Sequence, residues 1–213
     1  LKTEVFRSGK FVTQVEARLI QKGEVLAVLL ASFGRGRESN IHVQSQHAAP
    51  DYTQADDIPA LPYIQGMMPE FFQQTDLRWA KGRTPFTGSD KPDFGGWMRW
   101  QASFAEMTSA HLFALIDAWP PSVLPMFKEI APASSLCWTV EFLAELTGKN
   151  SDSWWQYQVM TDSTKSGYSH SEAHIWDDDG QLIADGAHAA LHREQFLGLP
   201  VVHEEIGRAS CRE

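Results

Sequence analysis

The stretch Glu172-Ala173-His174-Ile175-Trp176-Asp177-Asp178-Asp179-Gly180-Gln181-Leu182-Ile183-Ala184 predicts a β-hairpin, because two apolar runs flank a short polar turn that ends in glycine. Part of it repeats an earlier pattern, Glu16-Ala17-Arg18-Leu19 followed by Gly23-Glu24-Val25-Leu26-Ala27. A Ser-Gly pair precedes each copy, at Ser8-Gly9 and at Ser166-Gly167. The repeat indicates that one hairpin-rich unit was duplicated, although two amphipathic hairpins can also resemble each other by chance.

The composition is that of a packed globular protein. The chain has 213 residues, of which 43% are hydrophobic, with 8 Trp and 12 Phe, so it can form one large domain or two small ones. No stretch approaches the roughly 20 apolar residues of a membrane span. The net charge of −9 argues against nucleic acid as a partner, because phosphate binding needs a basic surface.

The cysteines predict a reducing compartment. There are two, Cys137 and Cys211, which is too few for a disulfide framework. No signal peptide precedes the first strand-like residues, and we therefore expect a cytoplasmic protein. Residues 196–213 have no apolar period, and we expect this tail to lie outside the fold.

The first third of the chain predicts strands followed by a connection. Residues 2–7, 10–21 and 24–33 have the composition of strands, and the third is apolar on both faces, which predicts a central strand. The strand-like pattern of apolar residues is lost from residue 34 to about residue 88, where Gln, Asp, Pro and Gly cluster. We expect this stretch to be a linker between two units.

The second unit contains the one predicted helix. Residues 103–119 predict it, with Ser103 as the cap and Glu106 completing a capping box. The part from 110 to 118 is apolar nearly all round, which predicts a buried helix, and Pro120-Pro121 ends it. Five strands are predicted around it, at 96–100, 134–146, 153–163, 167–177 and 181–193.

This order resembles the hotdog fold, in which an antiparallel sheet wraps a single helix. Residues 89–195, and to a lesser degree 2–33, resemble the type II acyl-CoA thioesterases of the double-hotdog, TesB-type thioesterase-like superfamily. The stretches that carry the resemblance are Leu115–Pro121, Ser135–Phe142, Gly167–Trp176, Asp179–Ala184 and Leu191–Arg193.

The resemblance implies an α+β double hotdog with antiparallel sheets that each wrap a long central helix. It implies a partial, N-terminally truncated first hotdog at 1–33, a linker at 34–88 and a C-terminal hotdog at 89–195. It also implies hydrolysis of acyl-CoA thioesters to free acid and CoA through an activated water, with no cofactor and no metal. We expect acyl-CoA as the substrate and assembly into a homo-oligomer.

The catalytic residues of the family match this chain incompletely. Members of the family use an Asp, a Thr or Ser, and a Gln to orient and activate water. Matched residue by residue, the Asp position falls on Cys137 and the Gln position on His188. The Thr or Ser position falls within Thr161-Asp162-Ser163-Thr164. Two of the three expected residue types are therefore absent.

Three interpretations remain open for the reaction. In the first interpretation, His188 is the base and Thr161 or Ser163 orients the water. Asp162 is then the spare carboxylate if the register shifts by one residue. Alternatively, Cys137 is a nucleophile activated by His188. In the third interpretation the domain binds acyl thioesters without catalysis. A hotdog dehydratase is a further alternative, which requires a histidine and a carboxylate that face each other.

Two further residues are expected at the substrate. Asp117, at the end of the predicted helix, either clamps the following strand or lines the site near the thioester. Gly167, in the hairpin region that resembles the family, is the second expected substrate-binding residue. The three-residue turn that ends at Gly180 places His170 opposite His188, but too few ligands converge there for a metal site.

Overall fold

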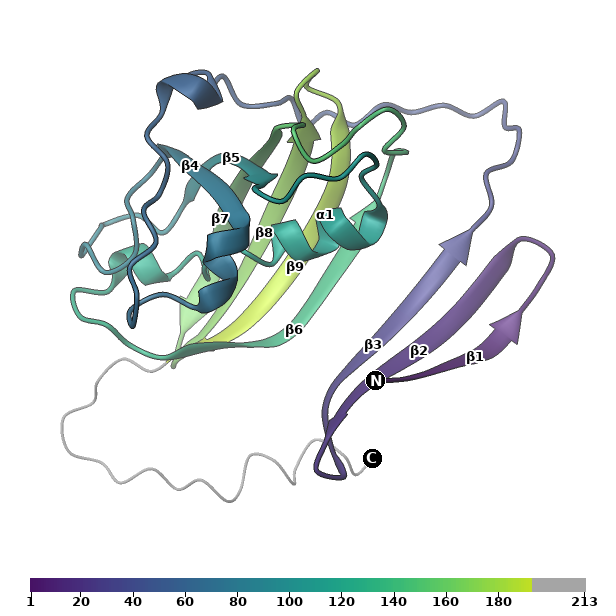
Figure 1. Cartoon of the computed structure of the whole chain (residues 1–213), viewed down its shortest axis with the longest axis horizontal. Helices are drawn as coiled ribbons and strands as arrows, with labels where there is room; N and C mark the ends of the chain where they lie inside the picture. Colours follow the sequence, from purple (N-terminus) through teal and green to yellow (C-terminus); the bar gives the residue numbers. More distant parts are fainter. Residues whose placement is uncertain (193–213) are drawn as a thin grey trace. The chain divides into compact units, whose positions relative to one another are not determined.

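The computed structural model describes residues 1–192, which fold as two compact units that are considered separately here (Figure 1). The first unit is Leu1–Gln44 and the second begins at Ser45. The predicted tail at 196–213 lies outside the described residues. Within the described part of the chain, no helix has both the length and the apolar character needed to cross a membrane.

The first unit is a three-stranded antiparallel sheet. Its strands are β1 (Lys2–Ser8), β2 (Val12–Gln21) and β3 (Glu24–Gly34), in the order β1-β2-β3. Lys22 and Gly23 both have positive φ angles, 52° and 86°, as a tight two-residue hairpin turn requires. The three strands predicted for this region are confirmed.

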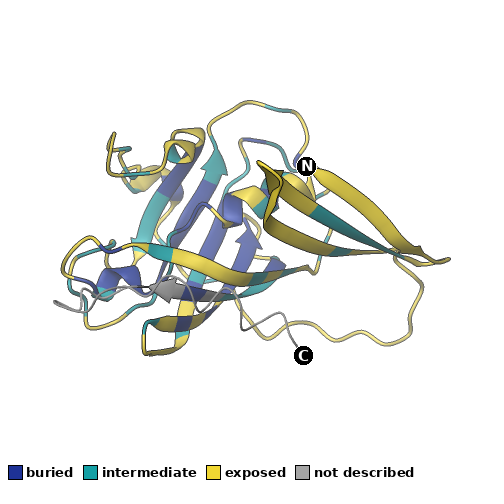
Figure 2. Cartoon of the chain, turned by 90° about the horizontal axis from the view of Figure 1, so that it is seen from below, coloured by how far each residue is buried: buried dark blue, intermediate teal, exposed yellow. Residues whose placement is uncertain are grey.

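The predicted position of the third strand is wrong. β2, not β3, is the central strand, and no second described strand pairs with β3. Its apolar residues are consequently exposed, including Val28 at 53% and Leu30 at 68%. Figure 2 shows that most of this sheet is exposed, in contrast to the second unit. Within the first unit, the apolar residues of β3 therefore form a surface that the other two strands leave uncovered.

The second unit is built on a six-stranded antiparallel sheet. Its strand order is β4-β5-β7-β8-β9-β6. The strands are β4 (Thr75–Lys81), β5 (Phe94–Trp100), β6 (Ala133–Phe142), β7 (Trp155–Lys165), β8 (Tyr168–Asp177) and β9 (Leu182–His192). Short 3-10 helices lie at Ala55–Asp57, Glu70–Gln74 and Leu124–Met126. The five strands predicted after residue 88 are confirmed.

β4 lies inside the stretch that was expected to be a linker. The strand contains charged residues, which are not typical of a buried strand, but these residues are paired in the fold. Asp76 is buried and accepts hydrogen bonds from Arg78, at 2.6 Å and 2.9 Å, and from Arg99 on β5, at 3.2 Å and 3.3 Å. Because Arg99 reaches Asp76 only once β4 and β5 pair, the strand was not evident from its local composition.

The helix α1 (Ser109–Ile116) is shorter than predicted and begins six residues later. Thr108, not Ser103, is its N-cap: the Thr108 hydroxyl accepts from the His111 backbone at 3.3 Å, and His111 Nδ1 accepts from the Thr108 backbone at 3.2 Å. The reciprocal bonds form a capping box in which histidine takes the place of the expected glutamate. The helix ends at Asp117.

The core of the second unit lies between α1 and the sheet (Figure 1). Leu112 and Leu115 of α1 are fully buried, which confirms the prediction of a buried helix. They belong to one apolar cluster with sheet residues such as Phe94, Trp155 and Ile175. Burying side chains of this size contributes about 1.5–3 kcal/mol each. This packing fixes the C-terminal end of α1 over the sheet.

The register of the β8–β9 hairpin differs from the prediction. His188 lies opposite Ser171, whereas His170 lies opposite residue 189. The difference arises near the turn, where the pairs Ile175–Ala184 and Trp176–Leu182 leave Ile183 as an extra residue. A bulge of this kind moves all later pairs by one position.

Candidate active site

Four residues on adjacent strands form a row across the sheet. Thr161 on β7 lies opposite Ser171 on β8, Ser171 lies opposite His188 on β9, and His188 lies opposite Trp138 on β6. Directly opposed residues of antiparallel strands point to the same face of a sheet. The row therefore places two hydroxyl groups, an imidazole and an indole on one face.

A pocket lies between this row and the end of α1. Its polar lining comes from Asp117, Ser122, Ser171 and His188. The remaining lining residues are largely apolar: Ile116, Trp119, Pro120, Trp138, Tyr157, Val159, Ala173, Ile175 and Gly186. An apolar pocket with a few convergent polar groups has the composition of a small-molecule site.

His188 is the titratable base of this pocket. It is half-buried, and its Nε2 atom lies 2.8 Å from Oγ of Ser135. Burial lowers the pKa of His188, and the negative charge of Asp117 opposes part of that effect. The imidazole is therefore neutral near pH 7, the state in which it can accept a proton.

Asp117 brings a carboxylate to the same pocket from the helix end. Burial raises the pKa of Asp117, and the electrostatic interaction with His188 acts in the opposite direction. The residue as a whole is exposed, although its carboxyl group is partly shielded from solvent in the pocket lining. Of the two roles considered for Asp117, its position in the pocket lining favours contact with a ligand over a clamp on the following strand.

Ser122 and Thr161 form a hydroxyl pair beside the pocket. Their oxygens lie 2.7 Å apart, and Ser122 is buried in the pocket wall. The backbone N–H of Thr161 donates to Asp93 at 3.0 Å, which fixes this part of β7. Ser122 was not identified from the sequence. Its only signal was its place directly after Pro120-Pro121, at the end of a stretch that resembles the thioesterases.

Three of the other expected polar residues lie outside the pocket. Asp162 and Ser163 are exposed, because a bulge between Thr161 and Ser163 interrupts the pairing of β7 with β8. A carboxylate oxygen of Asp162 lies 3.7 Å from Nδ1 of His170, which is also exposed. Cys137 is exposed and lies next to Trp138 on β6, so it points to the opposite face of the sheet from Trp138.

Gly167 also lies away from the pocket lining. It occupies the turn between β7 and β8 with a φ of 82°, and the preceding Ser166 has a φ of 55°. Both conformations belong to the left-handed region that a tight hairpin turn uses. The glycine thus serves the turn, and the residues brought together in the pocket are Asp117 and His188, with Thr161 adjoining through Ser122.

Two stacked aromatic rings form part of the apolar pocket wall. The rings of Trp119 and Tyr157 lie 4.8 Å apart and nearly parallel, at 5°. Burial raises the pKa of Tyr157, and the charge of Asp117 adds to this effect, so the phenol stays protonated. This part of the pocket wall is therefore aromatic and uncharged.

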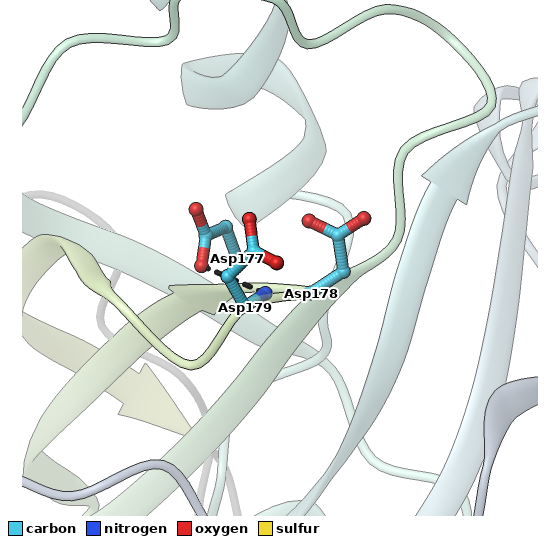
Figure 3. A group of neighbouring side chains, drawn as sticks. All are labelled: Asp177, Asp178 and Asp179. Carbon is cyan, nitrogen blue, oxygen red and sulfur yellow. Dashed lines mark hydrogen bonds between the residues drawn. The ribbon is translucent and has the colours of Figure 1, made fainter.

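A second acidic group lies at the β8–β9 turn (Figure 3). The carboxylates of Asp177, Asp178 and Asp179 lie close enough together to surround a cation. Lys149 already forms ion pairs with all three, including contacts of 3.2 Å to Asp177 and to Asp179. Burial lowers the pKa of Lys149, but these bonds more than offset it and keep the amine charged. Lys149 therefore occupies the position between these carboxylates and offsets part of their negative charge.

Residues 49–192 match the family model described as the acyl-CoA thioesterase C-terminal domain. The chain belongs to this family. The match covers the whole six-stranded sheet, α1 and the pocket between them. It confirms the resemblance to the TesB-type thioesterases that was inferred from the sequence.

Solved structures of similar fold extend over both units. A conserved hotdog-fold protein of unknown function from Alicyclobacillus acidocaldarius is 23% identical, with a TM-score of 0.77 over 94% of this chain and 72% of that one. The acyl-CoA thioesterase II TesB2 from Mycobacterium marinum is 21% identical, with a TM-score of 0.67 over 90% of this chain and 72% of that one. At these identities the likeness establishes the hotdog fold alone. Among curated proteins, none matches the chain.

Proposed function

We propose that this protein hydrolyses acyl-CoA thioesters to the free acid and CoA in the pocket between α1 and the sheet. The observation that carries the proposal is the convergence of His188 and Asp117 on a pocket with an apolar wall. The family to which the chain belongs supports the substrate class. The acyl group is a fatty or an aryl group that packs against Trp119 and Tyr157.

His188 acts as the general base. Its neutral imidazole takes a proton from the water whose oxygen ends in the acid product, and general-base catalysis of this kind contributes about 10²–10⁴-fold. Asp117 stabilises the imidazolium that forms, because opposite charges in a partly buried site attract each other. The Ser122–Thr161 pair supplies a hydroxyl donor near the carbonyl oxygen, where negative charge develops.

This assignment adapts the residues of the family. The family's aspartate and glutamine positions fall on Cys137 and His188, so a strand carboxylate and an amide are missing. Asp117 replaces the carboxylate from the end of α1, and His188 replaces the amide with a titratable group. Thr161 keeps the hydroxyl. Cys137 has no part in this mechanism because it is exposed on the other face of the sheet.

We extend the proposal to the architecture of the protein. Residues 1–33 belong to a first hotdog, which this chain carries only in part, and residues 89–195 to the second, within a double hotdog that forms homo-oligomers in the cytoplasm. Two observations support the first of these points. The apolar strand β3 lacks a partner on one side among the described residues, and similar structures extend over both units.

Two alternatives follow from the same pocket. A non-catalytic protein would bind the acyl thioester without releasing CoA. A dehydratase or hydratase requires a histidine and a carboxylate at one substrate, and the shared pocket of Asp117 and His188 meets that requirement.

One experiment separates the three functions. The purified chain is mixed with hexanoyl-CoA, benzoyl-CoA or hex-2-enoyl-CoA, and free thiol, loss of the conjugated double bond and binding are each measured. We expect free thiol from hexanoyl-CoA or benzoyl-CoA. Loss of the double bond without thiol would indicate a hydratase, and binding without either reaction would indicate a binding protein. Both results would contradict the proposed hydrolysis.

A further inference from the structure

A bulge in β6 turns Ser135 toward the candidate active site. Trp138 pairs with His188 and Cys137 pairs with residue 189, but Ser135 pairs with Ala190, so Leu136 is an extra residue. Ala190 shares the face of His188, because residues two apart on a strand point the same way. Without the bulge Ser135 would point to the opposite face. Bulges often re-aim a side chain beside an active site.

The bulge brings a hydroxyl to the base. Oγ of Ser135 lies 2.8 Å from Nε2 of His188, within hydrogen-bond distance. Ser135 is exposed, so its hydroxyl is accessible from solvent. Asp117 lines the same pocket as His188, and its charge acts to raise the pKa of the imidazole. His188 therefore has a serine hydroxyl at hydrogen-bond distance and a carboxylate in the same pocket.

This arrangement has the roles of an activated nucleophile. A serine hydroxyl is a weak nucleophile until a neighbouring base accepts its proton, and a third group then stabilises the charged base. We propose that Ser135 is the nucleophile of the reaction and carries the acyl group as an ester. The inference rests on the proposed thioester hydrolysis and names the atom that first attacks the substrate.

In the first step, Oγ of Ser135 attacks the thioester carbonyl carbon while its proton moves to Nε2 of His188. The carbon–sulfur bond breaks, and the same proton passes from Nε2 to the sulfur of CoA. In the second step, water attacks the serine ester and gives its proton to His188. The carbon–Oγ bond breaks, Ser135 recovers its proton from His188, and the free acid leaves.

Ser134 provides a matched control for Ser135. The two serines are adjacent on β6 and both exposed, but they point to opposite faces of the strand. The Ser134 hydroxyl donates to the carbonyl oxygen of Ser135 at 3.5 Å, whereas the hydroxyl within hydrogen-bond distance of His188 Nε2 is that of Ser135. Replacing Ser134 thus changes the same surface without removing the proposed nucleophile.

The test traps the ester. The full chain is mixed with hexanoyl-CoA or benzoyl-CoA, quenched in acid within milliseconds to minutes, and its intact mass and peptides are measured. We expect the wild type to gain the mass of one acyl group, located at Ser135. The adduct should persist in Ser134→Ala and be lost in Ser135→Ala and His188→Ala. Thiol release should fall about a hundredfold or more in Ser135→Ala.

The outcomes separate this inference from the proposed function. Thiol release that continues in Ser135→Ala within about twofold of the wild-type rate, with no adduct in the wild type, would overturn the serine nucleophile and leave hydrolysis standing. An adduct at Ser135 without turnover would support the nucleophile and contradict hydrolysis. Neither adduct nor thiol release would overturn both.

Discussion

Asp117 and His188 line one pocket from two different elements, the C-terminal end of α1 and strand β9, and each acts on the pKa of the other. The charge of Asp117 raises the pKa of His188, and burial lowers it more strongly. A base held neutral in this way, beside a carboxylate that favours its protonated form, is suited to take a proton and pass it on. Four predictions follow from the pocket and from the helix that positions it.

Replacement of His188 by alanine removes the base. We expect kcat/KM for hexanoyl-CoA to fall about 10²–10⁴-fold with little change in thermal stability. His170→Ala is the matched control, because His170 lies on the neighbouring strand but is exposed and pairs with Asp162. An His188→Ala variant as active as His170→Ala would show that the base lies elsewhere.

Asp117→Asn should change the pH dependence. The reaction requires neutral His188, so kcat/KM falls as the pH drops through the pKa of the imidazole. Because the charge of Asp117 raises that pKa, its removal lowers the pKa, and the acidic limb of the pH–rate profile should move to lower pH. The maximal rate should also fall, since the imidazolium loses its partner.

Profiles of kcat/KM against pH for the wild type, Asp117→Asn and Asp162→Asn measure this effect. Asp162 is exposed and does not line the pocket, so its variant should match the wild type. A shift of the Asp117→Asn limb to higher pH has the wrong sign for the proposed interaction and would refute it.

Thr161→Val removes the hydroxyl that pairs with Ser122 at 2.7 Å and keeps the shape of the side chain. We expect kcat/KM to fall about tenfold, as for the loss of about one hydrogen bond. Ser163→Ala should have no effect, because Ser163 lies beyond the bulge and is exposed. Steady-state thiol release by both variants decides which hydroxyl serves the site. The reverse order of effects would assign the role to Ser163.

Leu112→Ala tests the packing that positions Asp117. Leu112 is fully buried between α1 and the sheet, and we expect its truncation to cost about 2–5 kcal/mol of unfolding free energy. Leu136→Ala, at a residue that is 55% exposed, should change stability by less than about 0.5 kcal/mol. Urea denaturation followed by tryptophan fluorescence measures both. Equal effects would mean that α1 does not anchor the unit.

The hairpins could be predicted from the sequence because their signals are local. Gly23 and Gly180 occupy turns with positive φ, and apolar residues lie on both sides of each turn. The buried helix was predicted for the same reason, since its apolar residues are consecutive. Its start was misplaced because Thr108 and His111 form the cap, a pairing with histidine that the capping-box pattern does not include.

The features that could not be predicted depend on residues distant in sequence. β4 carries Asp76, whose charge is compensated by Arg99 only within the sheet. The pairing of His188 with Ser171 depends on an extra residue at Ile183, and a one-residue shift reverses the face of every later side chain.

The candidate site was predicted in part for the same reason. His188 and Asp117 were both candidate site residues in the sequence, and both line the pocket. Ser122 and Ser135 were missed, because each acquires its role from a contact across the fold, Ser122 with Thr161 and Ser135 with His188. Neither serine has a distinctive local pattern.

The most direct test of the proposed function is thiol release from acyl-CoA by the purified chain, measured for short, long and aryl acyl groups beside the His188→Ala variant. We expect turnover for at least one acyl class and its loss, by about a hundredfold or more, in the variant. Acyl-CoA binding without turnover in the wild type would contradict the proposed thioesterase activity. Equal turnover by both proteins would contradict the assignment of the site.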